Sequence, residues 1–268
     1  MIFLILLLAT ILLLLLPSSP TALAFSPLSL LKLQPKQKLK STTVETAKGD
    51  IRKLLAASNF FVDAFWTGKI GGGSSELSDK QQRQLSSLQF SEFRKRYAGV
   101  GRGPYAELLL CYGEVTVAGG GGGTDNDSIL IGCAGMEVQE IAPPDNTIKK
   151  QPNGISNPVV RAPLMSNVAV SKDFRRRGIG LQLVKEAENI AQYQWGFTDM
   201  YLFVEQRNKS AIRLYQKLGY SKQWIDANAK TLLPKGDKLE EDSTKIVCMK
   251  KRLDLNAFSR VLFSILGR

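Results

Sequence analysis

Three consecutive arginines stand directly before a glycine–isoleucine–glycine turn, in the stretch Phe174 to Val184 (FRRRGIGLQLV). Gly178 and Gly180 carry no Cβ atom, so an anion can approach the backbone closely at both positions. The apolar pattern after the turn predicts a helix, whose first N–H groups and dipole favour negative charge at that end. The guanidinium groups of Arg175–Arg177 could neutralise this charge. The spacing therefore favours a phosphate-binding turn, and pyrophosphate is a natural occupant.

A solvated basic turn before a surface helix is the alternative, because the bare pattern Arg-x-x-Gly-x-Gly is short enough to arise by chance. A second glycine-rich stretch, Gly119–Gly123, does not compete for the phosphate-binding role. Neither Lys-Ser/Thr nor a helix follows it, so we predict a hairpin turn there. The elements on either side of residues 175–180 must decide between the two interpretations of the arginine turn.

A buried strand and an amphipathic helix are predicted on the two sides of the turn. Ala162 to Val170 (APLMSNVAV) has the composition of a central strand, and Gly178 to Trp195 has one apolar face at helical spacing. A short buried strand follows at Met200 to Val204, and then a second helix, Asn208 to Leu218, which ends before Gly219. The turn thus lies between the end of a strand and the start of a helix, where unpaired helix N–H groups are available. This order favours the phosphate-binding turn.

The remaining pattern predicts a mixed α/β domain with the order ααββ(β)αβαββ and one continuous core. Asp50 is a plausible N-cap for the first of its helices. The other predicted elements are two helices at residues 50–66 and 78–97, and four strands at residues 105–118, 128–141, 220–225 and 245–253.

The strand–turn–helix segment resembles the acetyl-CoA-binding motif of the GCN5-related N-acetyltransferase (GNAT) superfamily, Arg/Gln-x-x-Gly-x-Gly/Ala. Downstream, Asn208 to Tyr220 (NKSAIRLYQKLGY) is similar to a second hallmark of that superfamily, Asn-x-x-Ala-x-x-x-Tyr with a terminal Leu-Gly-Tyr/Phe. The resemblance covers residues 45–253 and is closest to plastid members that acetylate lysines and protein N-termini, partly through SNVAV, RRRGIG and VDAFW. It implies acetyl-CoA as donor and a largely antiparallel mixed sheet, flanked by helices and splayed between its fourth and fifth strands.

The resemblance also implies roles for individual residues. Tyr215 would be the general acid that protonates the departing CoA thiolate, a charge that forms only in the transition state; a core tyrosine is the alternative. Asn208 would contact the cofactor, although capping its helix would also explain it. Val168 and Val170 would offer backbone amides to the pantetheine arm. The predicted cofactor-binding residues are Val168, Ala169, Val170, Arg175, Arg176, Arg177, Gly178, Ile179, Gly180, Leu181, Asn208 and Tyr215.

The resemblance gives no directly matching residue for the general base. Bacterial ribosomal-protein N-acetyltransferases carry a glutamate five residues before the motif asparagine, and the matching residue here is Phe203. Glu205 lies two residues later, on the same strand face, and is our candidate catalytic residue beside Tyr215. A solvated strand-end charge is the alternative for Glu205, and backbone carbonyls with ordered water could also remove the proton.

The composition excludes several other chemistries. The 268-residue chain has no histidine, so histidine triads and histidine metal sites are excluded. Cys111, Cys133 and Cys248 lie in apolar segments without CxxC spacing, so we expect buried thiols, no disulfide framework and no metal. The net charge of +12 is scattered apart from Arg175–Arg177, Lys250–Arg252 and the leader. Without a basic stripe interleaved with aromatics, no nucleic-acid partner is expected.

The first 44 residues have the pattern of a targeting leader. Residues 2–16 are apolar apart from one threonine, and an A-x-A cleavage site follows, so residues 1–24 are predicted to be a signal peptide, with a retained membrane anchor as the alternative. Residues 25–44 contain Ser, Leu and Lys but no acid, as in a transit peptide, and the Ala24-Phe25 junction resembles leaders of secondary plastids. We therefore expect a plastid location, with the secretory pathway as the alternative. Residues 45–253 would be the acetyltransferase domain and 254–268 an apolar tail, and membrane contact is expected only through the leader or this tail.

Together, these features predict an enzyme that transfers acetyl from acetyl-CoA directly to an amine in a ternary complex. A protein or peptide is the expected acceptor, through its N-terminal α-amine or a lysine ε-amine. A small-molecule amine acetyltransferase and a non-catalytic acyl-CoA-binding module share the same cofactor motifs and are the alternatives. No acetyl-cysteine intermediate is expected, because no cysteine adjoins either motif.

Overall fold

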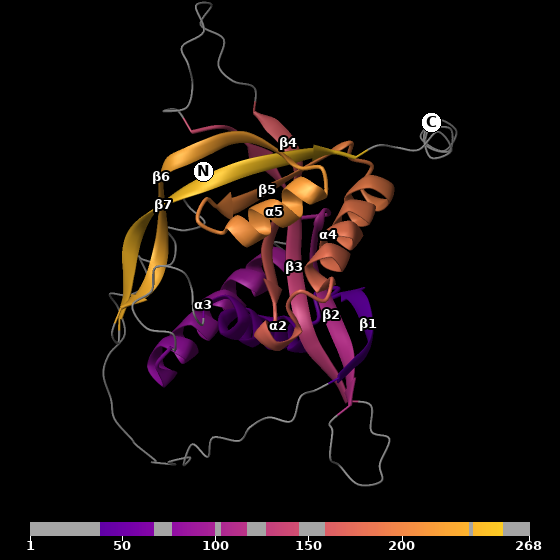
Figure 1. Cartoon of the computed structure of the whole chain (residues 1–268), viewed down its shortest axis with the longest axis vertical. Helices are drawn as coiled ribbons and strands as arrows, with labels where there is room; N and C mark the ends of the chain where they lie inside the picture. Colours follow the sequence, from indigo (N-terminus) through magenta and orange to yellow (C-terminus); the bar gives the residue numbers. More distant parts are fainter. Residues whose placement is uncertain are drawn as a thin grey trace, which may run out of the picture.

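A computed structural model describes residues 38–66, 77–99, 103–116, 127–144, 159–235 and 238–253 (Figure 1). The predicted signal peptide, residues 25–37 of the basic segment, the five-glycine run, residues 145–158 and the apolar tail lie outside the described residues. Within the described part of the chain, no helix is both long enough and apolar enough to cross a membrane.

Seven strands form one mixed sheet in the order β1-β2-β3-β4-β5-β7-β6. The strands are β1 (Lys38–Thr46), β2 (Ala106–Thr116), β3 (Asp127–Ile141), β4 (Val160–Val170), β5 (Asp199–Glu205), β6 (Ser221–Lys235) and β7 (Lys238–Arg252). All neighbours are antiparallel except β4 and β5, which are parallel and pair only at Leu164↔Tyr201 and Met165↔Leu202. Beyond Met165 the two strands separate. The predicted mixed sheet, splayed between its fourth and fifth strands, is confirmed.

Helices cover both faces of the sheet. They are α2 (Ile51–Phe61) with the π-helical turn η2 (Val62–Trp66), α3 (Asp79–Tyr97), the 3-10 turn η4 (Lys172–Phe174), α4 (Ile179–Asn189) with the π-helical turn η5 (Ile190–Gln194), and α5 (Lys209–Lys217). Leu108 and Leu110 of β2 pack with α2 and α3, whereas Leu109 and Cys111 pack with α4. Because helices lie on both faces, β2 is a continuous apolar run instead of an alternating one. Figure 1 shows α2 and α3 together, apart from α4 and α5.

Side-chain caps fix where three of these helices begin. The Asp50 carboxylate accepts hydrogen bonds from the N–H groups of Arg52 and Lys53, as an N-cap should. Ser78 and Gln81 form a capping box at the start of α3. The Asn208 side chain accepts from the N–H of Ala211 at 3.1 Å and begins α5. The caps predicted at Asp50 and Asn208 are confirmed.

The sheet extends further than the sequence pattern indicated. Lys38–Val44, which we assigned to the basic segment before the domain, belong to β1 and pair with β2. The strand was missed because an edge strand of mostly polar residues shows little apolar alternation. The β6–β7 hairpin is also longer than predicted, since β6 continues past Ile225 to Lys235 and β7 begins at Lys238. These outer segments pair with each other and carry many polar residues, so no apolar pattern marked them.

Three buried thiols predict a loss of stability at alkaline pH. Burial raises the thiol pKa to about 11 for Cys111 and to about 12 for Cys133 and Cys248, from about 8.5 when exposed. Because the folded pKa values are the higher ones, the unfolded chain releases these protons first as pH rises. The contribution is full below about pH 8.5, and above it the free energy of unfolding should fall by about 1.4 kcal/mol per pH unit for each thiol.

Urea unfolding at pH 7, 9 and 10 measures how the free energy of unfolding falls with pH. In Cys248→Ala this fall should be smaller by the contribution of one thiol. The comparison isolates thiol ionisation from other alkaline effects, because the alanine variant retains every other titrating group. A free energy of unfolding with the same pH dependence in both chains would contradict the burial of the Cys248 thiol.

Candidate active site

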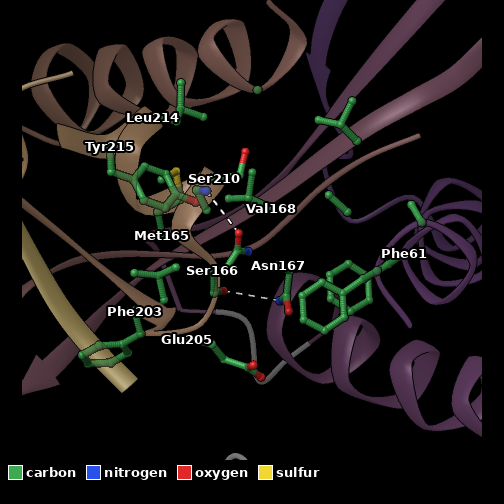
Figure 2. A pocket seen from close by; sticks show the side chains of 18 of the residues that line it. Phe61, Met165, Ser166, Asn167, Val168, Phe203, Glu205, Ser210, Leu214 and Tyr215 are labelled. Atoms are coloured by element: carbon green, nitrogen blue, oxygen red, sulfur yellow. Dashed lines mark hydrogen bonds between the residues drawn. The ribbon is translucent and has the colours of Figure 1, made fainter. Parts of the chain in front are cut away.

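A cleft of about 1370 Å³ opens where β4 and β5 separate. One side, called here the motif side, is formed by the end of β4, the turn that leads into α4, and α5. The other side, called the aromatic side, is formed by Phe61, Phe65 and Trp66 of α2–η2 together with α3. Every residue predicted for the site lies on the cleft wall except Arg177. Figure 2 shows Tyr215 and Leu214 across the cavity from Phe61.

The glycine turn leaves helix donors at the cleft wall. Gly178 is the N-cap of α4, with a left-handed backbone (φ 84°, ψ −3°), and no side chain caps this helix. The first N–H groups of a helix have no partner within it, so they are free for a ligand. A Cβ atom on Gly178 would meet nothing within 4 Å, which shows that the space in front of the turn is open. The turn can therefore bind an anion by its backbone.

The three arginines separate in the structure. Arg175 donates to the carbonyl oxygens of Ala64 at 2.8 Å and Val170 at 3.2 Å, so its guanidinium joins η2 to the end of β4. Arg177 lies outside the cleft wall, 5.3 Å from the ring centre of Phe174. Arg176, with φ 64°, lines the cleft and is the member of the three best placed to meet an anion.

Further cations on the motif side were not predicted. Lys172 lies just before the arginines, and Arg213 and Lys217 are exposed side chains of α5 that also line the cleft. Arg213 and Lys217 are four residues apart, so they share one face of the helix. The sequence could have revealed these two cations, because their four-residue spacing puts them together on the face of α5 opposite its apolar face. Together with Arg176 these groups give the motif side a positive potential that suits a polyphosphate ligand.

Tyr215 lies on the cleft wall with its ring largely buried, at 6% exposure. Its ring packs edge-to-face against Tyr220 with centroids 5.9 Å apart. Burial raises the pKa of the Tyr215 phenol above its usual value. Within the described residues no group hydrogen-bonds to the hydroxyl. The phenol at the cleft wall therefore keeps its proton at neutral pH.

Glu205 lines the cleft, but both of its oxygens are engaged. Oε2 lies 2.6 Å from Nε of Arg207, and Oε1 accepts a hydrogen bond from the Thr231 hydroxyl at 3.1 Å. Figure 2 shows Glu205 and Phe203 together on the side of the cavity away from Leu214. Phe203 occupies the position expected of a catalytic glutamate, and its ring packs on Trp224 with centroids 5.5 Å apart. Any base role of Glu205 must therefore work alongside its bonds to Arg207 and Thr231.

A bulge interrupts β4 at the cleft. Cys133 pairs with Ala169 and Gly135 with Ser166, so two residues of β4, Asn167 and Val168, lie opposite the single residue between Cys133 and Gly135. Asn167 has a left-handed backbone with φ 53°. A bulge bends the strand and turns its backbone groups away from the regular ladder. Ala169 still pairs with Cys133, whereas the amides of Val168 and Val170 alternate with it and face the side from which β5 has moved away.

The aromatic side of the cleft was indicated only by the short VDAFW stretch. Phe61 and Phe65 stack with ring centroids 4.9 Å apart, and α3 adds Glu92 and Arg96 to the wall. The α3 residues were missed because the helix is mostly polar and gave no sign of facing a cavity. Among the described residues, no group of three acidic, cysteine or histidine side chains could hold a metal ion.

The splayed sheet, the uncapped helix at a glycine turn and the Tyr215 phenol on α5 line one and the same cleft. The model of the acetyltransferase (GNAT) family matches residues 124–220, which span β3 to the end of α5 and contain the whole motif side. Residues 124–220 thus belong to a domain of the GNAT family of N-acetyltransferases, which implies acetyl-CoA as the acetyl donor.

Individual relatives are distant. The chain is similar to the chloroplastic GCN5-related N-acetyltransferase 7 of Arabidopsis thaliana, with 27% identity over 195 residues, 69% of each chain. Among solved structures, a GNAT acetyltransferase from Streptococcus pneumoniae has 14% identity and a TM-score of 0.45, over 80% of this chain and 100% of that one. The ribosomal-protein-S18-alanine N-acetyltransferase of Escherichia coli has 15% identity and a TM-score of 0.43, over 81% and 97%.

Proposed function

We propose that this enzyme acetylates protein amines, at an N-terminal α-amine or a lysine ε-amine, by direct transfer in a ternary complex. The observation that carries the proposal is the cleft, which runs from the glycine turn past Tyr215 to the aromatic side and measures about 1370 Å³. This exceeds the usual 300–1,000 Å³ of a site for one small ligand. It suits a donor and a peptide bound together, with the aromatic side as a surface for acceptor side chains.

The residues of the motif side fit acetyl-CoA. The free helix donors at Gly178 and the cations Lys172, Arg176, Arg213 and Lys217 suit its phosphates. The bulge at Asn167 and Val168 presents backbone that suits the pantetheine amides and the thioester carbonyl. When bound, acetyl-CoA supplies a thioester whose carbonyl carbon is attacked by an amine, so that the C–N bond forms and the C–S bond breaks.

The protein's own groups would then handle charge and protons. The backbone N–H groups of Val168 and Val170 would donate to the carbonyl oxygen as negative charge develops on it. Tyr215 would give its proton to the sulfur as the C–S bond breaks. Glu205 or water would accept the proton that the amine loses, and with Arg207 and Thr231 bonded to it, Glu205 is held in one orientation.

A plastid location is part of the proposal. Its support is the leader pattern of residues 1–44 and the chloroplastic relative from Arabidopsis thaliana. A small-molecule acceptor remains the second candidate, because the motif side would be the same for either acceptor.

Acetylation by the chain without its predicted signal peptide, residues 25–268, tests the acceptor. Peptides with free N-termini or internal lysines should be acetylated with kcat/KM at least about tenfold above spermidine or an aminoglycoside, a difference of about 1.4 kcal/mol. Peptides blocked at both kinds of amine are the matched control, and mass spectrometry locates the acetyl group. A preference for the small amines would overturn the protein acceptor. Tight CoA binding without any amine acetylation would overturn the enzyme mechanism.

A further inference from the structure

The last turn of α3 packs beneath the bulge in β4. Arg96 donates from Nη2 to the Ser166 hydroxyl at 3.0 Å, and it forms an ion pair with Glu137 of β3. Its side chain is only 12% exposed, yet it reaches the cleft wall. Ser166 is the last regularly paired residue of β4 before the bulge. One guanidinium therefore joins α3, β3 and the start of the bulge.

Tyr97, the next residue, packs against β3 beside the same bulge. It is 1% exposed, and a Cβ atom on Gly135 would lie 2.1 Å from its hydroxyl oxygen and 3.0 Å from its Cζ atom. The same Cβ would lie 3.4 Å from Nδ2 of Asn167. Tyr97 thus rests on the bare backbone of Gly135, where the β3–β4 register slips. Only glycine at position 135 permits this approach.

These contacts leave polar atoms buried. Nε of Arg96 and the hydroxyl of Tyr97 have no hydrogen-bond partner within the described residues, although Ser166 and Asn167 lie beside that hydroxyl. A buried polar atom without a partner destabilises the fold, and an apolar pair of the same shape would not. Stability alone therefore does not account for an arginine and a tyrosine here. Their position beneath the backbone that lines the cleft suggests a task in the reaction.

We propose that Arg96 and Tyr97 are positioning residues that hold the β4 bulge open, so that the backbone N–H groups of Val168 and Val170 face the thioester carbonyl. The inference rests on the proposed use of this cleft for acetyl transfer. Without the contact on Gly135 and the bond to Ser166, Asn167 could leave its left-handed conformation and β4 could return to regular pairing with β3. The donors would then point into the sheet instead of the cleft. Neither residue would touch the reacting atoms.

Gly135→Ala tests the contact directly. The new Cβ would displace Tyr97 and disturb the bulge, so kcat should fall by about tenfold to a hundredfold. The Kd for CoA should change by less than about twofold, because the phosphates bind at the distant Gly178 turn. Adding Tyr97→Phe removes the closest colliding atom, so the double variant should recover part of the lost kcat. Tyr97→Phe alone should lower kcat by a smaller factor.

Arg96→Lys tests the second contact. Lysine keeps the charge opposite Glu137 but lacks the planar fork that reaches Ser166 at the same time, so kcat should again fall with little change in Kd for CoA. Arg94→Lys is the matched control, since Arg94 lies in the same helical turn but is exposed and is not on the cleft wall. Thermal unfolding of every variant shows whether activity falls merely with the folded fraction.

The proposal is overturned if Gly135→Ala keeps full kcat, if kcat, Tm and CoA affinity fall together, or if Tyr97→Phe restores nothing. Amide NMR shifts distinguish failure of the positioning role of Arg96 and Tyr97 from failure of the proposed acetyltransferase function. In the unaltered chain, acetyl-CoA should shift the amide signals of Val168–Val170, and in Gly135→Ala these shifts should be lost while those of Ile179–Leu181 persist. That result supports the positioning role even if no amine is acetylated, and equal shifts in both chains refute it.

Discussion

Replacing Gly178 with aspartate should raise the Kd for CoA at least about a hundredfold, which corresponds to about 2.7 kcal/mol. The space in front of Gly178 is open for a side chain, so the new carboxylate would stand where the phosphates are expected. It would also cap α4 itself and take up the N–H groups that a phosphate would use. Isothermal titration with CoA measures the effect.

The effect of backbone strain must be separated from competition between the new carboxylate and the CoA phosphates, because Gly178 is left-handed and any other residue is strained there. Gly178→Ala adds the strain without the charge. Gly219→Ala is the matched control, since Gly219 is also left-handed, with φ 92°, and does not line the cleft. Both alanine variants should lose about 1–2 kcal/mol of stability, but only Gly178→Asp should lose nearly all CoA binding. Wild-type affinity in Gly178→Asp would refute the phosphate-binding turn.

Tyr215→Phe should lower kcat by about tenfold to a thousandfold, the usual contribution of a general acid. The phenol would stabilise a thiolate that exists only as the C–S bond breaks, so the Kd for acetyl-CoA should change by less than about twofold. Tyr220→Phe is the control, because its ring packs on Tyr215 but does not line the cleft. Steady-state kinetics with saturating acetyl-CoA gives kcat for all three proteins. An unchanged kcat in Tyr215→Phe would remove Tyr215 from the mechanism.

The pH dependence of the same reaction follows from the direction of the pKa shift. Burial raises the pKa of Tyr215, so the proton-donating form persists above pH 10, where an exposed phenol ionises. The kcat profile of the unaltered enzyme should therefore show no loss attributable to Tyr215 up to about pH 10.

The motif side of the cleft was largely predictable from sequence, because glycine favours tight turns and asparagine favours the N-cap of a helix. The turn predicted at Gly178 and the helix cap predicted for Asn208 are both present, and the structure adds that Gly178 is left-handed. The arginines show the limit of such patterns. Three consecutive side chains in an irregular turn point in directions fixed by local backbone angles, such as the φ of 64° at Arg176. The sequence alone therefore did not show that Arg175 joins η2 to β4, that Arg176 lines the cleft, and that Arg177 lies outside the cleft wall.

Long-range packing explains what the sequence did not show. Arg96 and Tyr97 end a polar helix, and their relation to the β4 bulge depends on β3, some forty residues away in the chain. The edge strand β1 carries too few apolar residues to be recognised alone. Tertiary contacts select both features, and no local periodicity reports them.

The position of β1 also has a consequence for maturation. β1 covers β2, a strand that is apolar towards both faces, and it is tied to the body by Lys53–Glu45 at 2.6 Å and Thr42–Gln182 at 2.8 Å. A protease that cut beyond Lys38 would remove part of β1 and expose β2 as an apolar edge strand, which could pair with other chains and aggregate. We therefore expect any cut that removes the predicted leader to fall before Lys38, so that β1 stays with the folded domain.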